Sequence, residues 1–229
     1  MSKNAFALLL CRALTLLLVL ASWPSQAQEQ PVDILFMRPH LSSLPAGAEL
    51  TYRLERSSSD TARLGEPFSD DIKLVVRSVA ASGGRDIDLR IFTGERAREV
   101  NAITDLTGNP VLVIFLDRAV SNMVRLTGGN APYFKNRLRS ALRDKATGAT
   151  IKAEFEGKTL DATRIVVRPF ADDANAERML GYQGSQFEFV VSDDAPGMLL
   201  DMKSSFVSTL VDAPKLEEHI FLRSSGTRP

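Results

Sequence analysis

The chain has 229 residues, of which 44% are hydrophobic and 24% charged, and its 28 basic residues balance 28 acidic ones. A chain without net charge has no global attraction for nucleic acid, which argues against a DNA- or RNA-binding protein. One cysteine and two histidines leave little material for thiol chemistry, metal binding or acid–base catalysis.

The N-terminal segment has the pattern of a secretory signal peptide. Lys3 and Arg12 supply positive charge, residues 13–21 are almost entirely apolar, and Ser25-Gln26-Ala27 places small residues three and one before a cut. The apolar run is only about half of the ~20 residues that a membrane-spanning helix needs. The sequence therefore predicts residues 1–27 as a signal peptide cleaved after Ala27, export to the periplasm, and at most peripheral contact with a membrane.

Cleavage would leave 202 residues, with 26 basic and 28 acidic side chains, because Lys3 and Arg12 lie in the leader. The single cysteine, Cys11, lies there too, and it follows leucines rather than the small residues of a lipoprotein signal. The exported chain is therefore expected to have no disulfide and to be stabilised by packing alone.

Residues 28–48 contain three prolines and predict an extended, irregular lead-in. A single domain is expected over 49–223 and a flexible tail over 224–229. Within the domain, residues 49–56 alternate apolar and polar side chains, which is typical of a half-buried strand. Further strands are expected, in chain order, over 72–79, 87–91 and 99–104.

The pattern then changes to that of helices. Asn109 followed by Pro110 is a favourable helix start, and apolar residues recur at spacings of three and four as far as Leu126. The run 111–116 also fits a buried strand, but the cap and the periodicity favour a helix. A glycine pair ends this helix, and a second helix is expected over 131–146.

Strand-like alternation returns after the second helix. The remaining strands are expected over 151–155, 162–167, 185–191, 198–202 and 217–223. The order of strands, two helices and strands, without βαβ repeats, predicts one α+β domain in which an antiparallel sheet carries both helices on one face.

No catalytic, cofactor or metal motif is found. His40 and His219 have no second histidine or cysteine at ligand spacing, so no metal site, cofactor or catalytic residue is predicted. Aspartate pairs at 70–71, 172–173 and 193–194 lie beside turn signals, where aspartate is favoured for its local hydrogen bonds. A hydrolase that uses turn carboxylates such as Asp172 or Asp193 is the third functional hypothesis.

The second helix carries a concentration of positive charge. It is either the solvated face of an amphipathic helix or a contact surface for anionic lipid headgroups. The residues that would make this contact are Lys135, Arg137, Arg139 and Arg143.

Three local features carry a resemblance to a known superfamily. They are the helix opening Gly108-Asn109-Pro110, the break Gly128-Gly129-Asn130 before Tyr133-Phe134, and the hairpin over 191–197. Together with the element order from Glu49 to about Arg223, they resemble the LolA/LolB-type lipoprotein carriers. The resemblance implies a curved sheet whose concave apolar face is closed by helices and holds an acyl chain.

The leading hypothesis is therefore a periplasmic, non-enzymatic binding or carrier module for an acyl chain, a lipid or a lipidated partner such as a lipoprotein. Its rival is a protein-interaction module of the cell envelope, in which the same apolar residues fill a solid core. The residues predicted to line the ligand cavity are Leu50, Tyr52, Leu54, Phe115, Leu116, Met123, Phe134, Phe187 and Phe189.

Overall fold

The computed structural model describes residues 29–227, so the predicted signal peptide lies outside the described residues. Nine strands in this range form one antiparallel sheet in the order β4-β3-β2-β1-β9-β8-β7-β6-β5. The strands are β1 (Ala48–Ser58), β2 (Phe68–Val79), β3 (Arg85–Ile91), β4 (Asn101–Leu106), β5 (Thr147–Phe155), β6 (Lys158–Val167), β7 (Gln186–Val191), β8 (Leu199–Phe206) and β9 (Leu216–Thr227).

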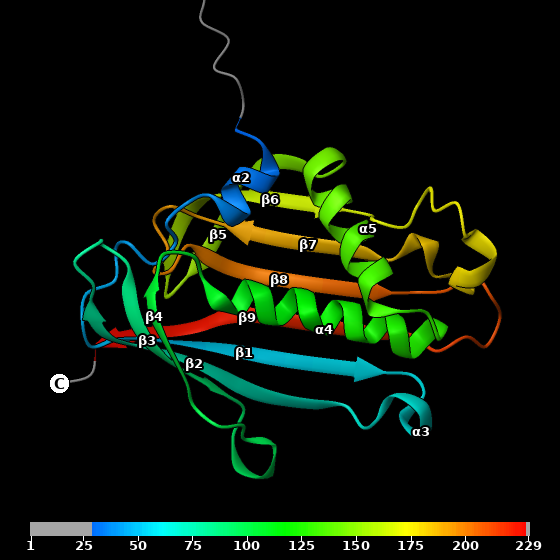
Figure 1. Cartoon of the computed structure of the whole chain (residues 1–229), viewed down its shortest axis with the longest axis horizontal. Helices are drawn as coiled ribbons and strands as arrows, with labels where there is room; N and C mark the ends of the chain where they lie inside the picture. Colours follow the sequence, from blue (N-terminus) through cyan, green and yellow to red (C-terminus); the bar gives the residue numbers. More distant parts are fainter. Residues whose placement is uncertain (1–28, 228–229) are drawn as a thin grey trace, which may run out of the picture.

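The sheet consists of two meanders, β1–β4 and β5–β9, joined where β1 pairs with β9. The helices are α2 (Pro31–Phe36), α3 (Thr61–Leu64), α4 (Pro110–Thr127) and α5 (Ala131–Asp144), with 3-10 turns η1 (Gly94–Arg96), η2 (Ala176–Met179) and η3 (Tyr182–Gly184). Figure 1 shows α4 and α5 lying across one face of the twisted sheet, with α2 beside them. The predicted α+β class, antiparallel sheet and mid-chain helices are confirmed.

Asn109 ties the start of α4 to the sheet. Its side-chain oxygen accepts from the Val111 amide at 3.1 Å and caps the helix. Its amide nitrogen donates to the Tyr52 hydroxyl of β1 at 2.8 Å and to the carbonyl of Gly197 at 2.9 Å. Gly197 has a φ of 72°, and a Cβ there would lie 2.5 Å from Leu50 Cδ1, so the β7–β8 hairpin needs glycine at this point.

The sequence predicts an extended lead-in, but part of this segment is helical. Residues Pro31–Phe36 form α2, which buries Ile34 and Leu35. Pro31 occupies the first turn of the helix, where its missing amide costs nothing. The helix is too short for a 3.6-residue period to show in the sequence, which is why the prolines alone dominate the pattern.

Two other segments contain structure that the sequence does not predict. Residues 224–227 are not a flexible tail but the end of β9, where they pair with 48–51 of β1. The polar loop after β1 contains the short helix α3, capped by Asp60, whose carboxylate accepts from the Arg63 amide at 3.0 Å. Both segments are polar and show no hydrophobic periodicity. Backbone pairing with β1 orders the first, and the Asp60 cap begins the helix in the second.

The lead-in also buries His40. Its Nε2 lies 2.8 Å from the carbonyl of Ile34. Burial lowers the pKa of His40 below its usual 6.5, and the charge of Arg38 acts in the same direction. The hydrogen bond to Ile34 and the charge of Asp193 oppose the shift.

Because the folded state favours neutral His40, the unfolded chain binds the proton more readily. We therefore expect the free energy of unfolding to fall as the pH drops below about 6.5, and the variant His40→Gln to lose this part of the pH dependence. Urea denaturation of both proteins at pH 7.5 and pH 5.5 measures it. An equal fall in both proteins would assign the dependence to other groups.

Candidate ligand-binding site

The residues predicted to line an internal cavity lie in the core between the sheet and the helices. Eight of the nine are fully buried, and Leu116 is half-buried. Aromatic rings meet edge to face where a hollow would be needed: Phe115 lies 5.4 Å from Phe189, and Phe187 lies 5.6 Å from Phe206 between ring centroids. The lining role of these residues therefore stays a prediction, and the space beside Leu116 becomes the more direct candidate.

Leu116 lines an open groove between α2, α4 and α5, with a volume of about 380 Å³. We call this the helical groove. Its apolar residues come from all three helices, and some are well exposed: Val113 is 56% and Phe36 is 44% exposed. The groove is lined by Val32, Phe36, Val113, Leu116, Asp117, Val120, Lys135, Leu138, Arg139 and Leu142.

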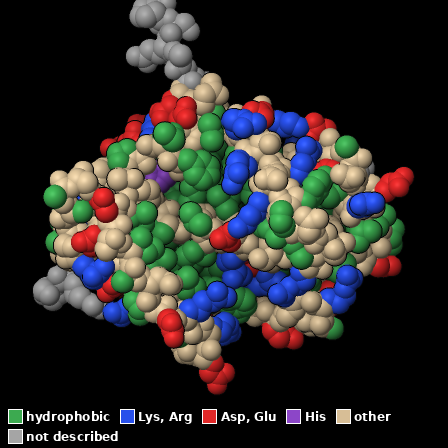
Figure 2. Space-filling view, viewed as in Figure 1, with side chains coloured by type: hydrophobic (Ala, Val, Ile, Leu, Met, Phe, Trp, Pro, Cys, Tyr) green, Lys and Arg blue, Asp and Glu red, His purple; other side chains and the backbone are tan. Residues whose placement is uncertain are grey.

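Figure 2 shows hydrophobic side chains gathered over α2 and α4, with lysine and arginine side chains beside them. Lys135 and Arg139, one turn apart on α5, supply positive charge to the groove. Lys135 pairs with Asp117 of α4 at 3.0 Å, whereas no acidic partner is recorded for Arg139 within the described chain. The structure thus brings together Leu116, Lys135 and Arg139, which the sequence singled out separately.

The other cations of α5 are paired within the protein. Arg137 contacts Asp173 at 3.0 Å, and Arg143 contacts Asp144 at 2.8 Å. These ion pairs reduce the charge that the helix presents to solvent. A contact with anionic lipid headgroups through Arg137 and Arg143 stays a prediction.

A second, larger cleft lies on the opposite flank of α4 and has a volume of about 840 Å³. We call it the arginine cleft, because five arginines from β1, the β3–β4 connection and α4 line it. Figure 2 shows lysine and arginine side chains gathered along the lower edge of α4. The lining residues are Arg56, Leu64, Gly65, Glu66, Phe68, Ile91, Phe92, Arg96, Arg98, Ile114, Asp117, Arg118, Ser121, Asn122 and Arg125.

Sequence reasoning missed this cleft. Arg118 and Arg125 precede the basic second helix in the sequence, and the remaining arginines of the cleft lie 20 or more residues before Arg118. Each of them follows the ordinary polar–apolar pattern of its own segment. No sequence signal connects them, because their proximity depends on how α4 crosses the sheet.

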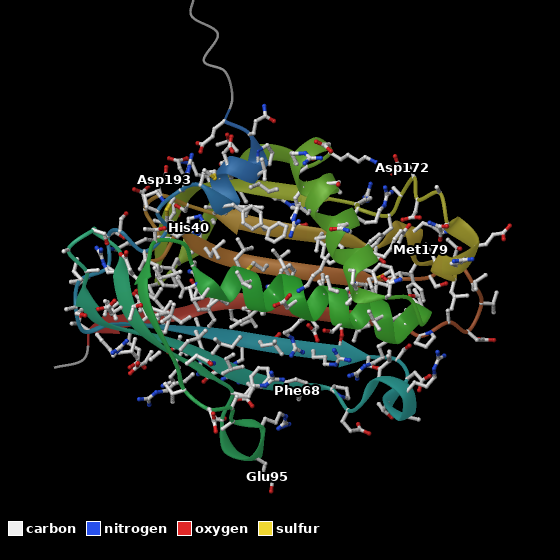
Figure 3. The ribbon with its side chains drawn as sticks, in the orientation of Figure 1. His40, Phe68, Glu95, Asp172, Met179 and Asp193 are labelled. Atoms are coloured by element: carbon white, nitrogen blue, oxygen red, sulfur yellow. The ribbon has the colours of Figure 1, made fainter. Side chains whose placement is uncertain are left out.

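Asp172 and Asp193, the carboxylates of the hydrolase hypothesis, do not lie together. Figure 3 shows Asp172 and Asp193 at opposite ends of the molecule. Asp172 pairs with Lys145 at 2.5 Å, and the hydrogen bond and charge of this lysine lower the pKa of its carboxyl. Asp193 pairs with Arg38 at 2.5 Å. The lowered pKa of the Asp172 carboxyl makes it poorly suited to act as a general acid.

Within residues 29–227, no group of three or more histidine, cysteine, aspartate or glutamate side chains is arranged to hold a metal ion. His219 instead contacts Asp201 at 2.5 Å on the sheet surface. Among the helices of the same described range, none has the length and apolarity to cross a bilayer.

Comparison with known proteins adds little to this geometry. No protein-family model matches the chain, and no curated protein matches it. Among solved structures it is similar to a LolA superfamily protein from Nitrosomonas europaea, with 10% identity, coverage of 88% of this chain and 94% of that chain, and a TM-score of 0.23. That neighbour is a member of the superfamily that the element order resembles.

Proposed function

We propose that the chain is a non-enzymatic binding or carrier module that works in the periplasm and holds an acyl chain, a lipid or a lipidated partner. The observation that carries this proposal is the helical groove, an open apolar channel whose walls come from α2, α4 and α5. Sites for small ligands are concave and mostly apolar, with a few polar groups that orient the ligand, and their volumes run from about 300 to 1,000 Å³.

The chemistry of the groove matches an acyl chain with an anionic end. Exposed Val113 and Phe36 leave apolar surface in water, and covering it with a hydrocarbon chain is favourable by about 25 cal/mol for each Å² removed from water. Arg139 has a guanidinium without a recorded acidic partner in the described residues, and it lies where a carboxylate or phosphate could end the chain.

A groove ligand does not require the core to open. The rings of Phe115, Phe187 and Phe189 can stay in contact while the ligand lies across the outer flank of α4. The same packed core favours the second candidate, a protein-interaction module of the envelope, in which the groove takes a partner's apolar side chains instead of a lipid.

The variant Val113→Glu tests the proposal. A carboxylate at this position should repel the anionic end of a fatty acid and hold water in the groove, and we expect binding of cis-parinaric acid to weaken at least about tenfold, which corresponds to ~1.4 kcal/mol. The fluorescence of the probe, titrated with purified protein, gives the Kd.

Val211→Glu is the matched control, because Val211 is 88% exposed in a loop far along the chain from the groove residues. It should leave the Kd unchanged. If the unaltered protein does not bind the probe, or if both variants lose binding equally, the acyl-chain proposal is wrong. Native mass spectrometry of the protein purified from periplasm would then be searched for a bound protein rather than a lipid.

A further inference from the structure

The floor of the arginine cleft holds a buried excess of positive charge. Glu218 of β9 is 1% exposed and is shared by two arginines, Arg56 of β1 and Arg118 of α4. The Nε of Arg118 donates to Glu218 at 2.9 Å, and Arg56 also donates to the carbonyl of Leu64 at 2.9 Å. Two guanidinium groups thus face one carboxylate, which leaves one uncompensated positive charge at the floor, with the Arg56 side chain 5% exposed and that of Arg118 20% exposed. A buried charge without a counterion is costly.

The floor also holds an unused hydrogen-bond donor. Asn122 of α4 is 4% exposed, and its side-chain oxygen accepts from Arg56 at 3.0 Å. The side-chain nitrogen of Asn122 is buried and has no partner in the described part of the chain. Buried polar groups are almost always hydrogen-bonded, so an unpartnered donor beside an open cleft indicates a site for an acceptor.

The rim adds three more cations. For the side chains of Arg96, Arg98 and Arg125, no acidic partner lies within ion-pair distance among residues 29–227, although Arg125 donates to the carbonyl of Leu64 at 3.2 Å. Glu95, next to Arg96, points away from the body of the molecule in Figure 3. The acids that line the cleft are Glu66 and Asp117, and Asp117 is paired with Lys135.

Aromatic rings hold two of these arginines in place. The guanidinium of Arg96 lies 4.8 Å above the ring of Phe68, and that of Arg118 lies 5.6 Å above the ring of Phe92. The two rings pack edge to face, 5.9 Å apart. A guanidinium stacked on a ring keeps its N–H groups in the plane free to donate, so the cleft combines anion donors with apolar walls.

We infer that the arginine cleft binds the phosphate group of an organic phosphate, with the rest of the ligand against Phe68, Ile91 and Ile114. A tetrahedral phosphate presents acceptor oxygens in several directions, as donors from the floor and from both rims require, whereas the two oxygens of a carboxylate lie in one plane. The inference goes beyond the acyl-chain proposal, because it rests on different residues on the other flank of α4.

Calorimetric titration of the full chain tests the inference with three soluble probes that share parts of one molecule. Dihexanoylphosphatidic acid carries both phosphate and acyl chains, dihexanoylglycerol lacks the phosphate, and glycerol 3-phosphate lacks the chains. We expect the first to bind at least about tenfold more tightly than dihexanoylglycerol. The triple variant Arg96→Gln, Arg98→Gln, Arg125→Gln should bind dihexanoylphosphatidic acid more weakly, by about tenfold for each arginine that donates to the phosphate.

The matched control removes the same charge elsewhere, with Arg90→Gln, Lys158→Gln and Arg178→Gln, none of which lines the cleft. It should change the affinity less than twofold. Equal affinity for glycerol 3-phosphate would support the phosphate site and identify its source as a soluble ester rather than a lipid headgroup. The inference is overturned if dihexanoylglycerol binds as tightly as the phosphatidic acid, if neither binds, or if the control triple loses as much affinity as the cleft triple.

The variant Val113→Glu separates this result from the acyl-chain proposal. It alters the helical groove and leaves every residue of the arginine cleft in place. Loss of parinaric acid binding with unchanged affinity for the phosphatidic acid would show two independent sites. Each proposal is therefore tested by its own probe: parinaric acid for the helical groove and the phosphatidic acid for the arginine cleft.

Discussion

Replacement of Glu218 by glutamine is expected to lower the free energy of unfolding by about 3–5 kcal/mol, the typical cost of removing one partner from a buried ion pair. Glu218 is the carboxylate shared by Arg56 and Arg118 at the floor of the arginine cleft. A glutamine of the same shape carries no charge and replaces one acceptor oxygen by an NH2 group that faces a guanidinium, so buried Arg56 and half-buried Arg118 would both lose their counterion. Urea denaturation at neutral pH measures the difference.

The neighbouring substitution Glu217→Gln is the control, because Glu217 is exposed and its carboxylate accepts a hydrogen bond from the Ser205 hydroxyl at 3.3 Å, with no cation paired to it in the described part of the chain. A change within about 0.5 kcal/mol is expected there. The triple variant Arg56→Met, Arg118→Met, Glu218→Leu should recover most of the loss, because it removes both guanidinium groups together with their shared carboxylate and leaves no desolvated charge. If Glu218→Gln is as stable as the unaltered protein, the carboxylate does not neutralise a buried charge.

Replacement of Phe187 by alanine is expected to cost about 3–5 kcal/mol of unfolding free energy, as for other buried phenylalanines. Phe187 projects from β7 into the layer between the sheet and the helices and is fully buried. Its ring contacts those of Phe115, Phe170 and Phe206 at centroid distances of 6.4, 6.4 and 5.6 Å. Alanine would remove these contacts and leave a cavity that a rigid sheet fills poorly.

Phe36→Ala is the comparison of equal size, because Phe36 is 44% exposed on α2 beside the helical groove. It should cost less than about 1 kcal/mol in stability while weakening binding of the fatty-acid probe. Thermal unfolding and probe titration of both variants separate the two roles. If Phe187→Ala costs no more than Phe36→Ala, the core is loosely packed, and an internal ligand cavity becomes the better hypothesis.

The sequence by itself determined the elements that depend on local chemistry. Alternation in β1 and β7 follows from one buried and one exposed face, and Asn109 and Asn130 cap their helices with their own side chains. These signals arise from neighbours within a few residues, so they can be recognised in the sequence without knowledge of the fold. They sufficed for the α+β class and for the position of both long helices.

The tertiary structure alone decided what the two faces of α4 meet. Val113 and Leu116 line a groove with α2, a helix too short to leave a period. Arg118 and Asn122 face Arg56 of β1 and Glu218 of β9, which lie 162 residues apart in the sequence. Burial and ion pairing act through space and depend on which strands become neighbours. An arginine in β1 has the same local pattern whether it faces solvent or a buried carboxylate, so only the packed sheet and helix assemble the two candidate sites.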